Sequence, residues 1–109
     1  MNFDQRKKRA NFILEKYKNS VPIIVTASKK TKFSIKRNQF IVSKDSRFLD
    51  FYRMIVPYID NLDPDQTFFM FVNGNYIPSY SMYISEIYDH YKNDDGFLYV
   101  TYIEENTFG

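Results

Sequence analysis

Seven consecutive residues near the end of the chain, F-L-Y-V-T-Y-I from Phe97 to Ile103, restrict its fold more than any other segment. The run is apolar at nearly every position, and a turn segment from Asn93 to Gly96 precedes it. Such a strand has to be covered on both faces, so we expect it in the centre of a sheet. A chain of 109 residues has room for one domain with one sizeable core around that strand.

Three other apolar segments predict the remaining strands. They occupy residues 21–26, 40–42 and 67–72. We expect the first two to form an antiparallel pair that is joined by a long basic and polar connection, residues 28–38. Asn73-Gly74, the strongest short turn signal in the chain, follows the third segment.

Apolar residues at helical spacing predict three helices. They cover residues 3–17, a segment that begins near Arg47 and that Pro57 ends or kinks, and residues 84–91. The expected N-caps are, in that order, Asn2 or Asp4, Asp45 or Ser46, and Ser81. The middle helix carries a second apolar row that either packs under the flanking loops or forms the floor of a groove. This row consists of Phe51, Met54 and Tyr58.

The order of these elements is helix, two strands, helix, strand, helix, strand. It predicts an α+β fold in which the first and last strands are the central pair of a four-stranded mixed sheet, an arrangement of the β-grasp type. We expect a single domain with an N-terminal helix in residues 1–19, a core in residues 20–103 and a flexible tail in residues 104–109.

Several kinds of chemistry are absent from the chain. It has no cysteine, which excludes disulfides, thiolate metal sites and a cysteine nucleophile and fits a reducing compartment. His90 is the only histidine, and there is neither a glycine-rich phosphate loop nor the spacing of metal ligands. No apolar run reaches the roughly 18 residues that span a bilayer, and the N-terminus lacks the apolar region of a signal peptide. We therefore expect no enzymatic activity, no metal and no cofactor.

Charge is distributed unevenly along the chain. Residues 1–53 carry 14 Lys and Arg against four Asp and Glu, whereas residues 54–109 carry one against nine. A polarised molecule of this kind is suited to electrostatic steering. The basic half either faces phosphates, acidic peptides or lipid headgroups, or is a solvated surface.

The sequence ends E-E-N-T-F-G, so that Gly109 stands at the end of a polar segment. A glycine carboxylate on such an arm can be activated, passed to a thiol and joined to an amine. Glycine also suits a narrow enzyme channel, because it has no Cβ. The alternative is an ordinary frayed terminus without a function.

Several strings resemble one known family. D-G-F-L-Y-V-T-Y (residues 95–102) followed by E-N-T-F-G is similar, almost letter for letter, to the C-terminus of the autophagy ubiquitin-like modifiers. This is the family of the yeast autophagosome modifier, the microtubule-associated protein light chain and the GABA-receptor-associated protein. Looser similarities follow in the family's order over about the whole chain. They lie at residues 6–17, 21–25, 40–42 and 68–73.

The resemblance implies conjugation through Gly109. An activating enzyme and a conjugating enzyme, which recognise Asn106, Thr107 and Phe108, would carry the glycine carboxyl as thioesters to the amine of phosphatidylethanolamine. A deconjugating cysteine protease is the further expected partner. The protein would be cytoplasmic, and bound to the autophagosome membrane or a cytoplasmic vesicle once it carries lipid. No nucleic acid partner is expected.

The resemblance also implies receptors with peptide motifs of the form aromatic-x-x-aliphatic. The peptide would add a strand beside residues 40–42. The aromatic pocket would consist of Ile13, Pro22, Ile24, Ile41 and Phe97. The aliphatic pocket would consist of Phe40, Val42, Phe51 and Met54. Arg37 and Lys44 would contact acidic residues that flank the motif. Plain core is the alternative for each apolar member.

The chain also departs from the family's pattern. Members usually open with an additional short helix, and this sequence begins about where their second helix starts. Ser43 and Ser46 stand where proline and leucine are usual, and Gln39 replaces a lysine. Val56 and Pro57 replace basic residues. The chain therefore resembles a divergent member. The open alternatives are conjugation to a protein lysine, a non-covalent scaffold and a nucleic-acid binder that uses the basic half.

Overall fold

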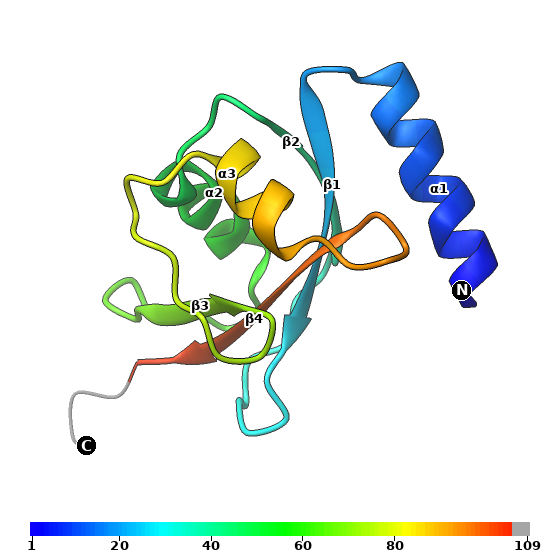
Figure 1. The fold of residues 1–109 in the computed structure, drawn as a ribbon. Coiled ribbons are helices and arrows are strands. Elements are labelled where there is room, and N and C mark those ends of the chain that lie inside the picture. The colour runs from blue at the N-terminus through cyan, green and yellow to red at the C-terminus, as the bar shows by residue number, and fades with distance from the viewer. Residues whose placement is uncertain (106–109) are drawn as a thin grey trace.

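The computed structural model describes residues 1–105, which form one sheet with helices on both of its faces (Figure 1). The helices are α1 (Phe3–Lys16), α2 (Phe48–Ile55), the short 3-10 helix η1 (Val56–Tyr58) and α3 (Ile84–Tyr91). The strands are β1 (Ser20–Ala27), β2 (Gln39–Ser43), β3 (Phe68–Val72) and β4 (Leu98–Glu104). These are the elements and the order that the sequence predicts.

The first and last strands are the central pair of the sheet. The strand order is β2-β1-β4-β3, with β1 parallel to β4 and both edge strands antiparallel to their neighbours. This confirms the four-stranded mixed sheet of the β-grasp type. Pro22 is tolerated in the central strand because the β1–β4 ladder begins one residue later, at Ile23 and Leu98.

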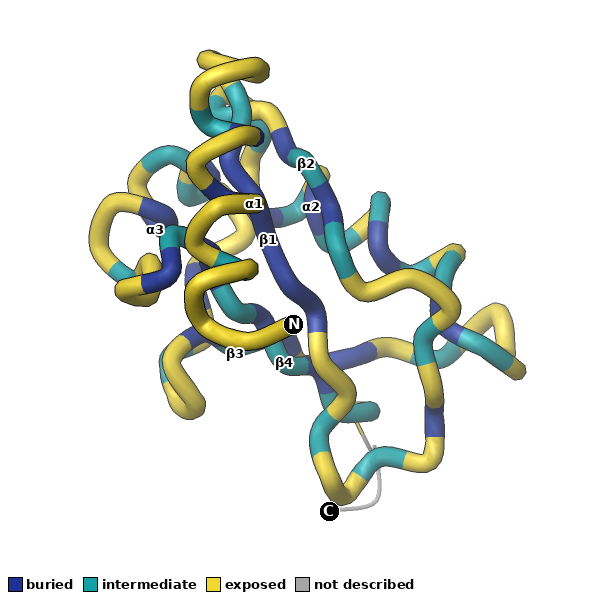
Figure 2. The backbone as a smooth tube through the Cα atoms, turned by 90° about the vertical axis from the view of Figure 1, so that its right-hand side faces the viewer, coloured by how far each residue is buried: buried dark blue, intermediate teal, exposed yellow. Residues whose placement is uncertain are grey.

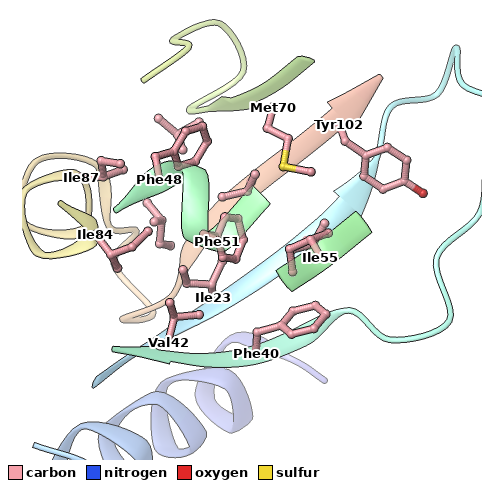
Figure 3. Close-up of a cluster of buried hydrophobic side chains, with 14 of the residues drawn as sticks. Ile23, Phe40, Val42, Phe48, Phe51, Ile55, Met70, Ile84, Ile87 and Tyr102 are labelled. Atoms are coloured by element: carbon pink, nitrogen blue, oxygen red, sulfur yellow. The ribbon is translucent and has the colours of Figure 1, made fainter. Parts of the chain in front are cut away.

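The main core lies between the sheet and the pair α2 and α3. Figure 3 shows side chains of both helices pointing toward those of the strands. Alternate residues of β4, namely Leu98, Val100 and Tyr102, are buried in this core, whereas the residues between them are half-buried on the other face. The second apolar row of α2 divides: Phe51 belongs to the core with 1% of its surface exposed, and Met54 and Tyr58 pack against its edge.

The starts of α2 and α3 differ from the prediction. The N-caps are Arg47 and Tyr83 rather than Asp45, Ser46 or Ser81. The segments that lead into the two helices run side by side, so that the Phe48 N–H donates to the Met82 carbonyl and the Ile84 N–H donates to the Ser46 carbonyl, both at 2.8 Å. Tertiary backbone pairing therefore satisfies N–H groups that a local cap would otherwise satisfy.

Local signals elsewhere are confirmed. Asn2 caps α1, since its side chain accepts from the Gln5 N–H at 2.9 Å and the Gln5 side chain accepts from the Asn2 N–H. Pro57 ends α2, which stops at Ile55 and continues as η1. Asn73 and Gly74 have φ of 52° and 82°, the left-handed pair that a tight primed turn requires.

Helix α1 packs on the opposite face of the sheet, across β1 (Figures 1 and 2). Its buried Ala10 forms a small second cluster with Ile24 and Phe97. Gly96, in the turn before β4, has φ of 89°, and a Cβ there would lie 2.9 Å from the Ala10 Cβ. The helix therefore approaches this turn more closely than any larger residue at position 96 would allow.

Candidate functional site

Strand β2 offers an open edge. Within residues 1–105, β1 is its only partner strand. The Lys44 N–H donates to the Asn19 carbonyl at 2.8 Å, and the ladder alternates from there in steps of two residues. Backbone groups at every second position consequently point away from the sheet, where an extended peptide can bind them. These positions are Gln39, Ile41 and Ser43, of which the Gln39 carbonyl already accepts from the Arg37 side chain and the Ser43 carbonyl from the Ser46 N–H.

A cavity of about 350 Å³ lies between α1 and the start of β2. It is lined by Arg9, Ile13, Lys36, Arg37, Asn38, Gln39, Phe40, Ile41 and Phe97. Its volume is at the lower end of the roughly 300–1,000 Å³ that is usual for small-ligand sites, which suits a single side chain of a partner. Its apolar part is built by α1, β2 and the residue before β4, three segments that are distant in sequence.

Three of the five residues expected in the aromatic pocket, Ile13, Ile41 and Phe97, line this cavity. The other two lie directly behind it: Pro22 is opposite Ile41 in the β1–β2 register, and Ile24 clusters with Phe97. The structure thus brings the five side chains together. Their role in binding stays a prediction.

The residues expected in the aliphatic pocket lie mostly inside the main core. Phe40 and Val42 are each 4% exposed, and Phe51 is buried beneath them, because alternate residues of β2 point toward α2. Only Met54 is half-buried. A partner side chain on this side would therefore contact the rim formed by Met54, and an aliphatic pocket here also stays a prediction.

Cationic groups surround the mouth of the cavity. Arg37 is exposed, its Nε donates to the Gln39 carbonyl at 2.9 Å, and its guanidinium lies 5.1 Å from the centre of the Phe40 ring. Arg9 and Lys36 also line the cavity. A carboxylate of a partner would meet Arg9 and Arg37 here, together with Lys36, whose charge is already paired with Asp60 at 3.4 Å.

Sequence reasoning identified Arg37 but missed Arg9 and Lys36. Arg9 could have been found, because it precedes Ile13 by four residues and so shares its face of the helix. Lys44, the other cation that was expected to contact an acidic flank, lies beyond the opposite end of β2 and does not line the cavity.

A buried carboxylate holds the wall of the cavity in place. Asp95 is 3% exposed and accepts hydrogen bonds from the Arg6 Nε (3.0 Å), the Tyr99 hydroxyl (2.6 Å) and the Phe97 N–H (2.9 Å). Burial by itself would raise the pKa of Asp95, but these hydrogen bonds outweigh it and lower that pKa. Burial and the bond to Asp95 raise the pKa of Tyr99 to about 12. Asp95 thereby ties α1 to Phe97.

The C-terminal residues expected to be recognised during conjugation, Asn106, Thr107, Phe108 and Gly109, lie outside the described residues. The chain leads to them from the C-terminal end of the central strand β4. Glu105 is hydrogen-bonded to Thr67, which immediately precedes β3, through its N–H (2.8 Å) and its carboxylate (3.1 Å). The last described residue is therefore still held by the fold.

The described part of the chain offers neither a metal site nor a helix that could span a membrane. Residues 1–105 contain no group of three or more His, Cys, Asp or Glu side chains that could hold a metal ion. None of the described helices combines the length and the apolar character needed to cross a membrane.

The helix-covered sheet with parallel central strands, together with the open edge of β2, places the chain among ubiquitin-like proteins. The crystal structure of Trypanosoma brucei ATG8 superimposes with a TM-score of 0.88 at 27% sequence identity, covering 100% of this chain and 93% of that one. The family model described as autophagy protein Atg8 ubiquitin like matches residues 5–109. The chain belongs to this Atg8 family of ubiquitin-like autophagy proteins.

Relatives from distant organisms show similar identity. Autophagy-related protein 8 of Candida glabrata is 36% identical over 108 residues, which cover 98% of this chain and 90% of the relative. The protein of the same name from Dictyostelium discoideum is 36% identical over 107 residues, covering 97% and 87%. Autophagy-related protein 8e of Arabidopsis thaliana is 36% identical over 109 residues, covering 99% and 88%.

Proposed function

We propose that this chain is a modifier whose Gly109 carboxyl is joined to the amine of phosphatidylethanolamine during autophagosome formation. The observation that carries the proposal is that the family match runs through the last residue, Gly109, and is not confined to the folded core. The tail also begins at the exposed end of β4, beside Thr67, where enzymes can reach it. A conjugate of this kind is a covalently anchored docking protein and needs no catalytic group of its own.

The conjugation reaction requires ATP and two enzymes but no cofactor bound to this chain. An activating enzyme joins the Gly109 carboxylate to AMP from ATP and releases pyrophosphate. A cysteine thiolate displaces AMP to give a thioester, and a conjugating enzyme takes the acyl group in the same way. The lipid amine then attacks the thioester carbonyl, forming an amide and releasing the thiol. A cysteine protease that hydrolyses this amide would reverse the reaction.

Attachment to this lipid is sufficient to hold the protein on a membrane. Phosphatidylethanolamine supplies two acyl chains, and two chains give stable anchoring where a single one is reversible. The protein would then be cytoplasmic before conjugation and on the autophagosome or a cytoplasmic vesicle after it.

The second part of the proposal is that the anchored domain binds peptides of the form aromatic-x-x-aliphatic along β2. In a strand, residues three apart point to opposite faces of the sheet. The aromatic side chain would then enter the cavity beside Ile13 and Ile41, and the aliphatic one would reach the α2 side at Met54. An acidic residue before the motif would lie near Arg9, Lys36 and Arg37. Spacing, open edge and charge thus support the same peptide pose.

Conjugation is tested by the intact mass of the protein from the membrane fraction of its own cells, beside a Gly109→Ala variant. We expect an adduct with the mass of phosphatidylethanolamine on the native chain and none on the variant. An isopeptide link to a protein lysine would instead assign the chain to protein conjugation. Unmodified mass with equal membrane abundance of both versions would contradict conjugation and favour a non-covalent scaffold.

A further inference from the structure

The long connection between β1 and β2, residues 28–38, lies beside the point where the tail leaves the fold. The Ser28 N–H donates to the Tyr102 carbonyl at 2.9 Å, and the Thr31 hydroxyl donates to the Glu104 carboxylate. Figures 1 and 2 show the loop after β1 and the end of β4 at the same end of the molecule. Any partner or membrane that binds the tail therefore lies close to this loop.

The loop is strongly basic. Residues 28–38 contain five Lys and Arg and no Asp or Glu. Two of the five cations have partners, because Lys36 pairs with Asp60 at 3.4 Å and Arg37 binds the Gln39 carbonyl. The other three cations, Lys29, Lys30 and Lys32, are exposed and form no ion pair with any residue in the range 1–105. We call these three residues the lysine cluster.

Covalent geometry limits how far the lysine cluster can be from whatever is bonded to Gly109. Four residues follow Glu105, and four residues span at most about 14 Å in any conformation. Attraction between a lysine and an anionic surface acts over a Debye length, about 8–10 Å at physiological salt. An anchored Gly109 consequently keeps Glu105, and with it the loop that is bonded to the neighbouring Glu104, no more than about 14 Å from the attachment point, so the cluster can approach the headgroups.

We propose that the lysine cluster is a membrane-contact surface that binds anionic lipid headgroups and orients the anchored domain. The inference rests on the proposed lipid attachment, and it adds the lipid class and the face that meets the membrane. Glu104, which accepts from Thr31 within the loop, lies next to the cluster and weakens its field, so binding without an anchor is weak. Anchoring makes the contact intramolecular, which raises its effective concentration and makes a weak attraction sufficient.

The position of the cluster favours a lipid surface over the other polyanions. A nucleic acid or an acidic peptide could bind a basic loop anywhere on the protein. Only a membrane is delivered to this loop by the chain's own attachment point. The second basic region lies on α1. Arg9 of this helix is near the loop, since it lines the cavity with Lys36 and Arg37, but at the other end of the helix the eight residues of β1 separate Lys18 from Lys29 by about 26 Å. Lys16 and Lys18 can therefore be tested independently of Lys29 and Lys30.

The experiment uses a reversible anchor of known strength. The chain has no cysteine, so one cysteine added after Gly109 can be coupled to a maleimide that carries a single 14-carbon chain. One such chain gives only marginal, reversible membrane binding, so an additional attraction shifts the partition measurably. Partition is measured by flotation on vesicles of phosphatidylcholine alone and on vesicles with 30% phosphatidylserine. The coupling is chemical and requires no conjugating enzyme.

Two charge-matched variants are compared, Lys29→Gln with Lys30→Gln, and Lys16→Gln with Lys18→Gln. Each removes two positive charges from exposed side chains. We expect the wild type to prefer the anionic vesicles at least tenfold, the loop variant to lose roughly tenfold or more of that partition, and the α1 variant to change less than about twofold. On neutral vesicles all three proteins should partition equally.

Three results would overturn the proposal. The first is an equal loss of partition onto anionic vesicles in the two variants, which would reflect net charge alone. The second is a wild type that shows no preference for anionic vesicles. The third is a loop variant that loses binding to a single-stranded RNA oligonucleotide but partitions onto vesicles as the wild type does. The last result would assign the loop to nucleic acid. Because the anchor is synthetic, these outcomes are independent of whether the native chain acquires phosphatidylethanolamine in cells.

Discussion

The helices on the two faces of the sheet are stabilised by different kinds of interaction. On one face, α2 and α3 cover a continuous apolar core of aromatic and aliphatic side chains in which the described residues bury no charged group. On the other face, α1 contributes Ala10 to a three-residue apolar cluster with Ile24 and Phe97. The packing of this helix also depends on the buried Asp95, which accepts hydrogen bonds from Arg6 and Tyr99. The first face therefore specifies the fold, while the second positions one helix and leaves a cavity beside it.

The comparison predicts that truncating the α2 face unfolds the domain most strongly. Phe51→Ala should lower the free energy of unfolding by about 3–5 kcal/mol, because it leaves a cavity among closely packed side chains. The matched change Phe12→Ala removes an exposed ring of α1 and should stay within about 0.5 kcal/mol. Urea denaturation followed by circular dichroism measures both. Similar losses for the two variants would contradict the division between the faces.

A smaller effect is expected on the α1 face. Asp95→Asn removes a buried charge that three donors stabilise, so we expect a loss of about 2 kcal/mol at neutral pH. Asp94→Asn, at the exposed neighbour, is the control and should be nearly neutral. Hydrogen exchange should show faster opening of α1 in the Asp95 variant with the α2–α3 core still protected. Uniform loss of protection would show that both faces unfold as one unit.

Because the pKa of Asp95 is lowered in the folded protein, the stability that the α1 face contributes depends on pH in the acidic range. The pKa of Asp95 in the folded state is lowered, so the stabilisation is present above the carboxyl's ordinary unfolded pKa and is lost as the pH falls through the folded value. Wild-type stability should therefore decline on acidification more steeply than that of Asp95→Asn. Parallel profiles of the two proteins would indicate that other carboxyl groups dominate.

The raised pKa of Tyr99 predicts that stability also depends on pH in the alkaline range. The folded pKa of Tyr99, about 12, lies above the ordinary value of 10.0, so its contribution is complete below pH 10 and disappears as the pH rises toward 12. Tyr99→Phe cannot ionise and should lack this decline, although other tyrosines still titrate. Ultraviolet titration of phenolate absorbance measures the difference between the two proteins. Loss of a tyrosine that titrates near pH 10 would place the Tyr99 hydroxyl outside the buried network.

The smallest expected effect concerns the cavity that this arrangement leaves. Arg9→Gln should weaken binding of an aromatic-x-x-aliphatic peptide with one preceding acidic residue by up to about fivefold, because exposed charge pairs contribute at most about 1 kcal/mol. Lys8→Gln, on the same helix but outside the cavity lining, is the control. Calorimetric titration at two salt concentrations measures both. Equal effects of the two substitutions would mean that the cavity mouth does not bind the acidic residue.

Much of the local structure could be predicted from the sequence. The central strand, the turn after β3 and the end of α2 follow from the apolar run 97–103, from Asn73-Gly74 and from Pro57 respectively. These signals are local, because a backbone conformation or a missing N–H belongs to the residue itself. The candidate site was predictable only through resemblance to the family, since its apolar residues follow the same spacing as ordinary core residues.

The sequence by itself determined the order of elements, the sheet and the family, because periodicity, turn residues and the family-like C-terminal string all consist of residues that are close together along the chain. Tertiary structure alone decided the caps of α2 and α3, the burial of Asp95 and the convergence of Arg9 and Lys36 on one cavity. Arg6 and Asp95 are 89 residues apart. Contacts between such positions depend on how the layers pack, and no spacing in the sequence encodes them.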